Sequence, residues 1–352
     1  MIFYYDAIGI KSEKSGASAI FYYADKNHKI INITDGGYKT SEEVVEHINK
    51  YYGKNIHFDN VIVTHNDNDH AGGVKNILEN YSVGKLWMLR PWLYAEELLP
   101  RFARYRSVES LSNKLREIYS NLSELEEIAE SEGIPIYEPF QGCRIGKSLV
   151  LAPSKERYLD LIIESEKTPQ PALDSATAIL RNFISETLGL VKSLWGQENF
   201  SSEGTSAENE MSVVQFINLE DSRYLLTGDA GREGLTEALD FLEILYGRIP
   251  KITLFEVPHH GSRHNLSTEL MDRMFGKRLV YPLPEGQEIF RTIIHASKDD
   301  PDHPRKAVVR AIHHRGGKVN ISANGYLTGR GYPQRPGWGP LKGLPYPEEQ
   351  EE

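Results

Sequence analysis

The chain has 352 residues, of which 39% are hydrophobic, so it can bury a large core in one big domain or two small ones. Its formal net charge of −10 argues against a broad, nonspecific grip on duplex DNA, which needs clustered Lys and Arg. The chain has no apolar run of membrane-spanning length and no basic, signal-like start, so we expect a soluble cytoplasmic protein without a membrane partner. The single cysteine, Cys143, fits a reducing compartment because it cannot form an internal disulfide.

Short β-type runs alternate with amphipathic helices in the first part of the chain. We expect a strand at 30–33, a helix over 40–52 that ends before Gly53, and a strand at 60–63. A helix over 74–80 and a strand over 85–89 follow.

Between residues 93 and 208 the pattern changes to long helices, which we interpret as an insertion. The stripe Leu111, Leu115, Ile118, Leu122 and Leu125 predicts one continuous helix that stops before Gly133 and Pro135. A second helix is expected over 174–195. The simplest interpretation of these stripes is packing within the monomer, and the alternative is a homodimer face, a protein-partner surface or a substrate lid.

The remaining pattern returns to strands. We expect a strand within 141–153, a mobile loop over 196–210, and a hairpin made by 211–219 and 222–227. A helix over 232–246 follows, with Leu235, Leu239, Leu242 and Leu245 inward, and then strands 289–295 and 318–323 around a helix over 305–314. We place one domain over 1–325 and an extended or disordered tail, rich in Pro and Gly and then acidic, over 326–352.

Potential metal ligands gather directly after the strand at 60–63. His65, Asp67, Asp69 and His70 precede a Gly-Gly pair, so the strand delivers them to a sheet edge and alternate side chains can converge there. Short runs rich in Asn and Asp are also common turns. Two further strands end in ligand-type residues, however, one in Gly228-Asp229 and one in the pair His259-His260. Three such strands favour a metal site.

These motifs resemble the metallo-β-lactamase-fold hydrolases, in the variant form of the hydrolase-like module of ComEC-type DNA-uptake proteins. The motifs that carry the resemblance are Asp35-Gly36-Gly37, His65-x-Asp67-x-Asp69-His70, Asn209-x-x-Ser212, Thr227-Gly228-Asp229, His259-His260-Gly261-Ser262, Ser297 and His303-Pro304, in the family's order over most of 1–325. The resemblance implies an α/β (α+β) fold, an αββα sandwich with the insertion at about 93–208. Asp67 and Asn209 stand where the family's common form has two histidines, as in the ComEC-type variants.

The resemblance also implies the site roles and two divalent ions, Zn²⁺, Mn²⁺ or Mg²⁺. His65 and Asp67 would bind one ion, Asp69 and His70 the other, and Asp229 would bridge them, with His260 the preferred ligand of its pair. The residues expected to support these ligands or to replace one of them are Asp35, Asn209, Ser212, His259, Ser262 and Ser297. Asp35 is equally interpretable as a turn residue of Asp-Gly-Gly.

Catalytic roles follow from the same comparison. Asp69 would bind metal and steer the attacking hydroxide, and His303 would protonate the leaving group, with Ser262 and Ser297 as alternatives. Arg263 is a candidate phosphate ligand, although an ordinary surface arginine is an equal interpretation. Each of these assignments depends on the loops meeting in one pocket.

The oxygen-rich ligand set favours a phosphodiesterase or nuclease, since hard donors favour phosphate esters over β-lactams. The acidic composition favours single-stranded nucleic acid or a nucleotide-based small molecule as substrate. Two alternatives stay open: a hydrolase of a lactam, thioester or amide, and a non-catalytic metal-stabilised component of a multi-protein defence system.

Overall fold

The computed structural model describes residues 2–102, 104–165, 189–322, 327–332, 335, 338–339 and 342–352, and this part contains two seven-stranded sheets. The first sheet has the strand order β17 (Leu327–Tyr332), β1 (Ile2–Ala7), β2 (Ala19–Ala24), β3 (Lys29–Thr34), β5 (Asn60–Ile62), β7 (Leu86–Trp87) and β8 (Ile136–Tyr137). The second has the order β16 (Gly317–Ile321), β15 (Phe290–Ile294), β14 (Leu254–Glu256), β13 (Ser222–Leu226), β12 (Val214–Leu219), β10 (Ser148–Ala152) and β9 (Arg144–Ile145). Two short strand pairs lie apart from these sheets, β4 (His57–Phe58) with β6 (Ser82–Val83), and β11 (Leu190–Lys192) with β18 (Glu349–Glu351).

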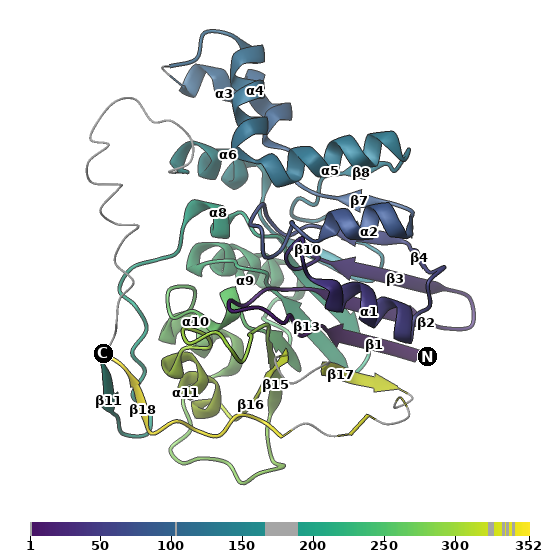
Figure 1. The fold of residues 1–352 in the computed structure, drawn as a ribbon. Helices are drawn as coiled ribbons and strands as arrows, with labels where there is room; N and C mark the ends of the chain where they lie inside the picture. Colours follow the sequence, from purple (N-terminus) through teal and green to yellow (C-terminus); the bar gives the residue numbers. More distant parts are fainter. Residues whose placement is uncertain are drawn as a thin grey trace.

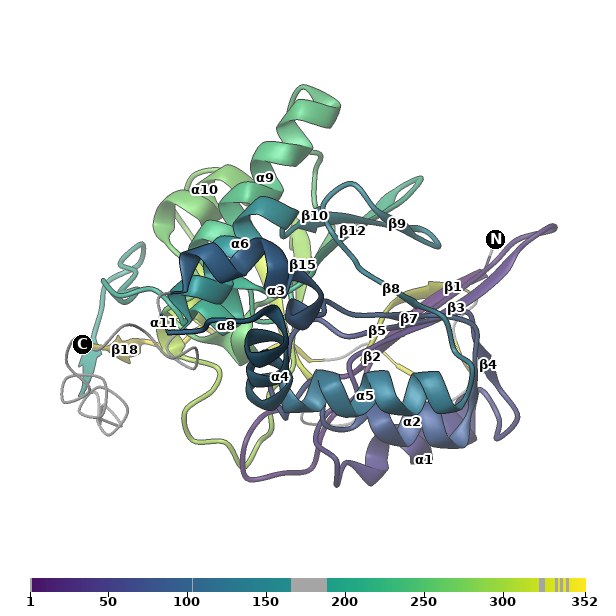
Figure 2. The ribbon, with the colours of Figure 1, turned by 90° about the horizontal axis from the view of Figure 1, so that it is seen from above.

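The two sheets pack face to face, and helices cover their outer sides (Figure 1). Helices α1 (Glu42–Tyr51), α2 (Val74–Asn80) and α5 (Ser120–Ser131) lie on the first sheet, and α9 (Arg232–Tyr246), α10 (Thr268–Phe275) and α11 (Lys306–His314) lie on the second, as Figure 2 shows from above. The other described helices are α3 (Ala95–Leu98), α4 (Val108–Ile118), α6 (Lys155–Glu164) and α8 (Ala207–Glu210), with 3₁₀ turns η1 (Pro91–Tyr94), η2 (Leu99–Arg101) and η3 (His259–Gly261). The arrangement is an αββα sandwich, as the sequence predicted.

The interior has three layers, because each sheet buries both faces. Between the sheets, Phe3 and Tyr5 of β1 pack with Tyr224 of β13, at ring-centroid distances of 6.4 and 5.9 Å from it. The strands next to the site therefore alternate buried side chains on both sides, which fixes their register. Helices α2 and α9 have their predicted bounds, 74–80 and 232–246. The hairpin is also confirmed, although β12 begins three residues later and β13 ends one residue earlier than predicted. Leu245 was expected inward, but it is 47% exposed.

The single helix predicted through Leu111 and Leu125 is wrong. The chain leaves the helical conformation at Tyr119 (φ −97°, ψ 52°), so α4 and α5 are separate helices whose leucines are nonetheless buried. The break brings the start of α5 onto the 65–70 loop, where Asn121 Nδ2 donates to the backbone oxygen of Asn66 at 2.7 Å. The insertion therefore braces the loop that carries the candidate ligands.

The tail was predicted to be extended or disordered, and its described strands are extended and hydrogen-bonded. β17 joins the edge of the first sheet beside β1, and β18 pairs with β11. β11 also corrects the helix predicted over 174–195, since residues 190–192 form a strand, while 166–188 lie outside the described residues. The loop predicted over 196–210 ends in α8. None of the helices in the described ranges combines the length and apolar character needed to cross a bilayer.

Glycines position the 65–70 loop through close backbone contact. A Cβ atom on Gly73 would lie 2.0 Å from the oxygen of Gly36, and one on Gly36 would lie 2.3 Å from the backbone of Gly73. The loop after β3 and the loop after β5 therefore touch at a point where only glycine fits. Their contact is secured by Gly36 N, which donates to the oxygen of His70 at 2.8 Å.

Candidate metal centre

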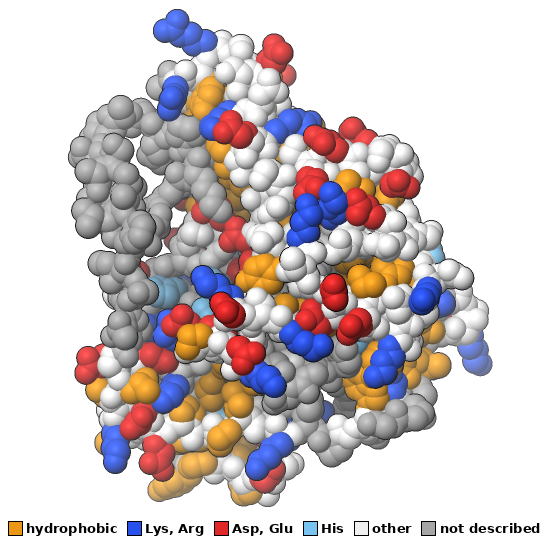
Figure 3. Space-filling view, viewed as in Figure 1, with side chains coloured by type: hydrophobic (Ala, Val, Ile, Leu, Met, Phe, Trp, Pro, Cys, Tyr) orange, Lys and Arg blue, Asp and Glu red, His pale blue; other side chains and the backbone are white. Residues whose placement is uncertain are grey.

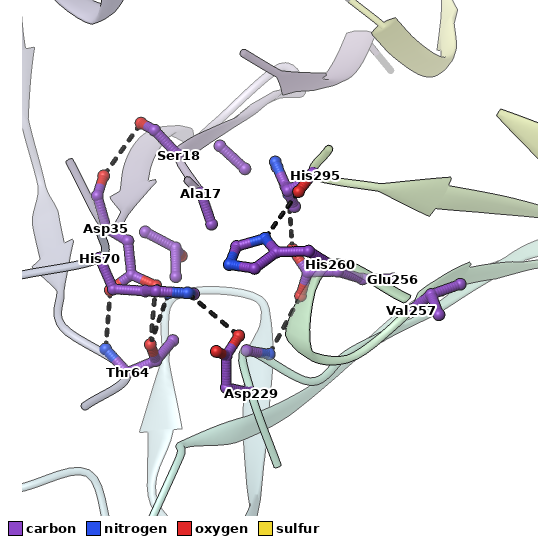
Figure 4. Close-up of a pocket in the computed structure, with 13 residues that line it drawn as sticks. Ala17, Ser18, Asp35, Thr64, His70, Asp229, Glu256, Val257, His260 and His295 are labelled. Atoms are coloured by element: carbon purple, nitrogen blue, oxygen red, sulfur yellow. Dashed lines mark hydrogen bonds and ion pairs between the residues drawn. The ribbon is translucent and has the colours of Figure 1, made fainter. Parts of the chain in front are cut away.

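The candidate ligands meet at the ends of strands from both sheets. β5 leads into His65–His70, β13 into Asp229, and β14 into the His259-His260 pair of η3. Figure 4 shows His70, Asp229 and His260 converging. Strands β13, β14 and β15 are parallel, so their carboxyl ends reach the same edge of the sheet. Residues 160 or more positions apart in the sequence thus share one pocket.

Asp229 lies between the histidines with its two carboxylate oxygens facing different neighbours. Oδ1 is 3.0 Å from His70 Nε2, and Oδ2 is 3.9 Å from His65 Nε2 and 3.8 Å from His259 Nε2. The side chain is buried, and its backbone N–H donates to Ser212 Oγ at 3.1 Å. A carboxylate so placed can bind one cation through each oxygen.

Asp35 fixes the orientation of the His70 ring through Nδ1, the ring nitrogen that faces away from the centre. Its Nδ1 lies 2.7 Å from Asp35 Oδ2, and the same carboxylate accepts hydrogen bonds from Thr64 N (2.8 Å) and Thr64 Oγ1 (2.7 Å). Asp35 has the left-handed φ of 56°, which turns its side chain back onto this loop. Since the carboxylate only accepts, His70 carries a proton on Nδ1 and points Nε2 at the centre, where a cation would take the place of any proton on that nitrogen.

Asp69 and His260 form the second side of the centre. His260 Nε2 lies 2.9 Å from Asp69 Oδ2, and His260 Nδ1 donates to the backbone oxygen of His295 at 2.6 Å. His70 Nε2 is 3.9 Å from Asp69 Oδ2. These three residues bring one oxygen and two nitrogens within 4.8 Å of one another.

His65 and Asp67 lie on the other side of Asp229. His65 Nδ1 contacts Thr64 Oγ1 at 3.0 Å, and its Nε2 is 3.8 Å from Asp67 Oδ2. The atoms of His65, His70 and Asp229 form a second group within 4.8 Å. The other five predicted metal ligands therefore lie on the two sides of Asp229.

The charges of the centre act on one another through short distances. Burial raises the pKa of Asp69, but the hydrogen bond from His260 and the charge of His70 outweigh it and lower the pKa to about 2. Burial lowers the pKa of His70, while the carboxylates of Asp229 and Asp35 raise it well above the usual value. A divalent cation would compete with these protons for the same atoms, so cation binding should strengthen as pH rises.

The residues fit a divalent cation on each side of Asp229. The Nε2 atom of His65 is buried and has no hydrogen-bond partner among the described residues, and that of His70 faces a carboxylate oxygen of Asp229 at 3.0 Å. An imidazole nitrogen with a free lone pair beside carboxylate oxygens is the donor set of zinc and manganese sites. Burying such nitrogens without a partner is otherwise unfavourable.

His303, the predicted proton donor, lies beside the histidine pair. Its ring stacks on His259 at a centroid distance of 5.9 Å and an interplanar angle of 27°, and its Nδ1 is 3.3 Å from Asp300 Oδ2. Ser15 Oγ donates to the same carboxylate oxygen at 2.7 Å. These contacts hold the His303 ring beside His259, with Nε2 on the side of the ring away from Asp300.

Three expected participants have other contacts. Ser262 Oγ accepts from His264 N at 3.3 Å, and Ser297 Oγ donates to the backbone oxygen of Ser12 at 2.5 Å, so both hydroxyls secure loops. Arg263 is buried and its Nη1 donates to the backbone oxygen of Glu352 at 2.7 Å, so it is not an ordinary surface arginine, and its role as a phosphate ligand stays a prediction.

Sequence reasoning missed Glu256, the buried carboxylate at the end of β14. Its Oε2 accepts from Thr227 N at 2.8 Å, and its Oε1 lies 3.0 Å from Tyr5 Oη and 2.9 Å from His295 Nε2. Glu256 therefore holds the turn before Asp229 and the residue whose carbonyl orients His260 (Figure 4). A charged residue inside the apolar run Leu254–Val257 was the available signal.

Comparison of the sequence with protein-family models and with curated proteins gives no match. Solved structures give distant likenesses. A hydrolase of the β-lactamase superfamily, AbOPH, has 9% identity and a TM-score of 0.34 over 68% of this chain and 71% of that one. The metallo-β-lactamase SMB-1 bound to 2-mercaptoethanesulfonate has 10% identity and a TM-score of 0.31 over 73% and 82%. A mutant of the CmlA β-hydroxylase has 11% identity and a TM-score of 0.38 over 93% of this chain and 54% of that one. At this level of similarity the site's chemistry has to come from its own residues.

Proposed function

We propose that the protein is a metal-dependent hydrolase, a phosphodiesterase or nuclease with a dinuclear centre of the kind that the HxDxDH motif suggests. The observation that carries this proposal is Asp229, whose two oxygens face separate groups of imidazole nitrogens at 3.0 to 3.9 Å. Two divalent ions held there would supply a nucleophile by lowering the pKa of bound water and would stabilise negative charge on the substrate.

Residues of the chain then have separate roles in the proposed reaction. Asp69 is more exposed than Asp229, with 22% against 4% of its side chain accessible, so it is the carboxylate placed to orient the attacking water. Asp300 accepts from Nδ1 of His303, so the ring would give a proton to the leaving group from Nε2 as an imidazolium. Glu256 and Asp35 keep the ligands in place without touching substrate.

Phosphodiesters are favoured over lactams by the donor set. Asp67, Asp69 and Asp229 supply carboxylate oxygens, and hard oxygen donors suit the ions that assist phosphoryl transfer. Basic and acidic side chains are interspersed over the face seen in Figure 3, so that face favours a short single-stranded or nucleotide-sized substrate over a long duplex.

The test is hydrolysis of bis(p-nitrophenyl) phosphate by the full chain with added Mn²⁺. We expect turnover in the wild type, loss of at least a hundredfold in Asp229→Ala, and wild-type turnover in the control Asp221→Ala, an exposed hairpin residue. Turnover that survives Asp229→Ala contradicts the proposal. Tight metal binding without turnover of any phosphodiester, β-lactam or thioester would instead favour the non-catalytic, metal-stabilised alternative.

A further inference from the structure

The side chain of Asn209 contacts the back of His259. Its Nδ2 lies 2.7 Å from Thr205 Oγ1 and 3.2 Å from His259 Nδ1. Asn209 thereby contacts a histidine ring on the side opposite the ring's Nε2. If the ion held by His65 and Asp67 has a further nitrogen ligand, a residue other than Asn209 must provide it.

The tautomer of His259 is set by Asn265. The buried Asn265 amide donates from Nδ2 to the backbone oxygens of Asp229 (2.8 Å) and Ala230 (3.3 Å), which turns its Oδ1 toward His259 Nδ1 at 3.0 Å. Nδ1 of His259 also lies 3.2 Å from Asn209 Nδ2, but that amide has a nearer acceptor in Thr205 Oγ1 at 2.7 Å. Since the Asn265 oxygen only accepts and is the nearer neighbour, Nδ1 of His259 carries the proton and donates to Asn265. Its Nε2 therefore keeps a lone pair, the form in which an imidazole binds metal.

That lone pair faces the same oxygen as His65. His259 Nε2 is 3.8 Å from Asp229 Oδ2, and His65 Nε2 is 3.9 Å from it. Both distances are too long for hydrogen bonds. They are close to the separation of roughly 3.4 Å between two ligands of a tetrahedral zinc ion with bonds of about 2.0 to 2.1 Å. Shifts of a few tenths of an ångström would bring each nitrogen into bonding range of a shared cation.

The backbone turns the two histidines toward different carboxylates. His259 and His260 have φ values of 48° and 54°, a left-handed conformation that is uncommon for non-glycine residues and unusual in succession. His260 reaches Asp69, while His259 reaches Asp229 Oδ2. Such conformations persist where the surrounding structure fixes them, and they cluster at functional sites.

We infer that His259 is a direct metal ligand, which completes the first ion position together with His65, Asp67 and Asp229. The inference rests on the proposed dinuclear centre and adds to it an imidazole from the β14–α10 loop. Asn265 is then the positioning residue for this ligand. Both histidines of the pair bind metal, one on each side of Asp229.

Metal titration of the full chain tests the inference. With Zn²⁺ or Mn²⁺ followed by elemental analysis after gel filtration, we expect two ions in the wild type, one in His259→Ala, and two in the control His264→Ala, a half-buried histidine of the same loop. Asn265→Ala keeps the imidazole but loses the tautomer control, so the weaker site should lose about 10- to 100-fold in affinity. Two ions bound with wild-type affinity in His259→Ala would overturn the inference.

A readout on the wild-type chain avoids dependence on the folding of a variant. In ¹⁵N-histidine NMR, zinc should shift the Nε2 resonances of four rings, those of His65, His70, His259 and His260. Shifts confined to the other three, with His259 unchanged, would overturn the inference and leave the proposed function intact. If the wild-type chain binds no metal, both the inference about His259 and the proposed function are contradicted.

Discussion

Replacing Asp35 by Asn separates the support of His70 from the support of the fold. The Asp35 carboxylate accepts from Thr64 N, Thr64 Oγ1 and His70 Nδ1, all within 2.8 Å. An Asn side chain has the same shape and can still accept from Thr64 N through its oxygen. Its NH₂ group then faces His70 Nδ1 and cannot accept the proton there.

Two outcomes are open to His70 in Asp35→Asn, and both weaken metal binding. If the ring keeps its tautomer, Nδ1–H is buried without a partner, which costs about 1 to 3 kcal/mol. If the proton moves to Nε2, the lone pair no longer faces the centre. The first cost alone corresponds to a loss of roughly 5- to 150-fold in affinity, in line with about 10- to 100-fold for supporting residues of metal sites. The free energy of unfolding of the metal-free chain should fall by only about 1 to 2 kcal/mol.

Isothermal titration with Zn²⁺ and urea unfolding of the metal-free chain measure the two effects. Asp59→Asn is the matched control, since the Asp59 carboxylate also accepts from a backbone N–H, that of Ile31 at 2.7 Å, but lies outside the centre. We expect wild-type zinc affinity in the control. Unchanged zinc affinity in Asp35→Asn, with the chain folded, would refute the assignment of His70 as a ligand oriented by Asp35.

Three further predictions concern buried polar groups. Glu256→Ala leaves a hydroxyl, an imidazole and a backbone N–H without their acceptor, so urea unfolding should show a loss of about 3 to 5 kcal/mol, with a smaller loss in Glu256→Gln. Arg310 is fully buried and donates to four backbone carbonyls in 193–197 and at 347, so Arg310→Met should also cost about 3 to 5 kcal/mol in urea unfolding. Burial raises the pKa of Glu198, but hydrogen bonds from His314 and Arg315 outweigh it and lower the pKa from 4.5 to about 2. Its ionised form therefore stabilises the fold above pH 4.5, and this stabilisation is lost as pH falls from about 4.5 to about 2, which acid unfolding of the wild type and Glu198→Gln would show.

Each of these has a contradicting result. Equal stability of Glu256→Ala and the wild type would mean that the three donors find other acceptors. A loss below about 1 kcal/mol in Arg310→Met would mean that the carbonyls are hydrated. Parallel acid-unfolding curves for the wild type and Glu198→Gln between pH 4.5 and 2 would contradict the role of the Glu198 carboxylate.

Local patterns predicted much of the fold. α2 and α9 have apolar spacing and turn signals at both ends, and the hairpin of β12 and β13 follows from two apolar runs around a short polar turn. The break at Tyr119 could not be predicted in this way. Leu115 and Leu122 continue one periodic stripe whether or not the helix is interrupted between them.

Long-range contacts account for the other errors. β18 pairs with β11, about 160 residues away, and an acidic strand has no pattern that names such a partner. The ligand loops were predictable because each is a local motif at a strand end. Glu256 was not, since its role depends on Tyr5 and His295 meeting it from distant strands. The contact of Arg263 with Glu352 likewise depends on where β18 lies.

The most direct test of the dinuclear centre is anomalous diffraction from crystals grown with Zn²⁺ or Mn²⁺, recorded at the metal absorption edge. We expect two peaks about 3.5 to 4 Å apart, one within bonding distance of Oδ1 of Asp229 and the other of Oδ2. Peaks elsewhere, or none within bonding distance of Asp229, would contradict the dinuclear centre.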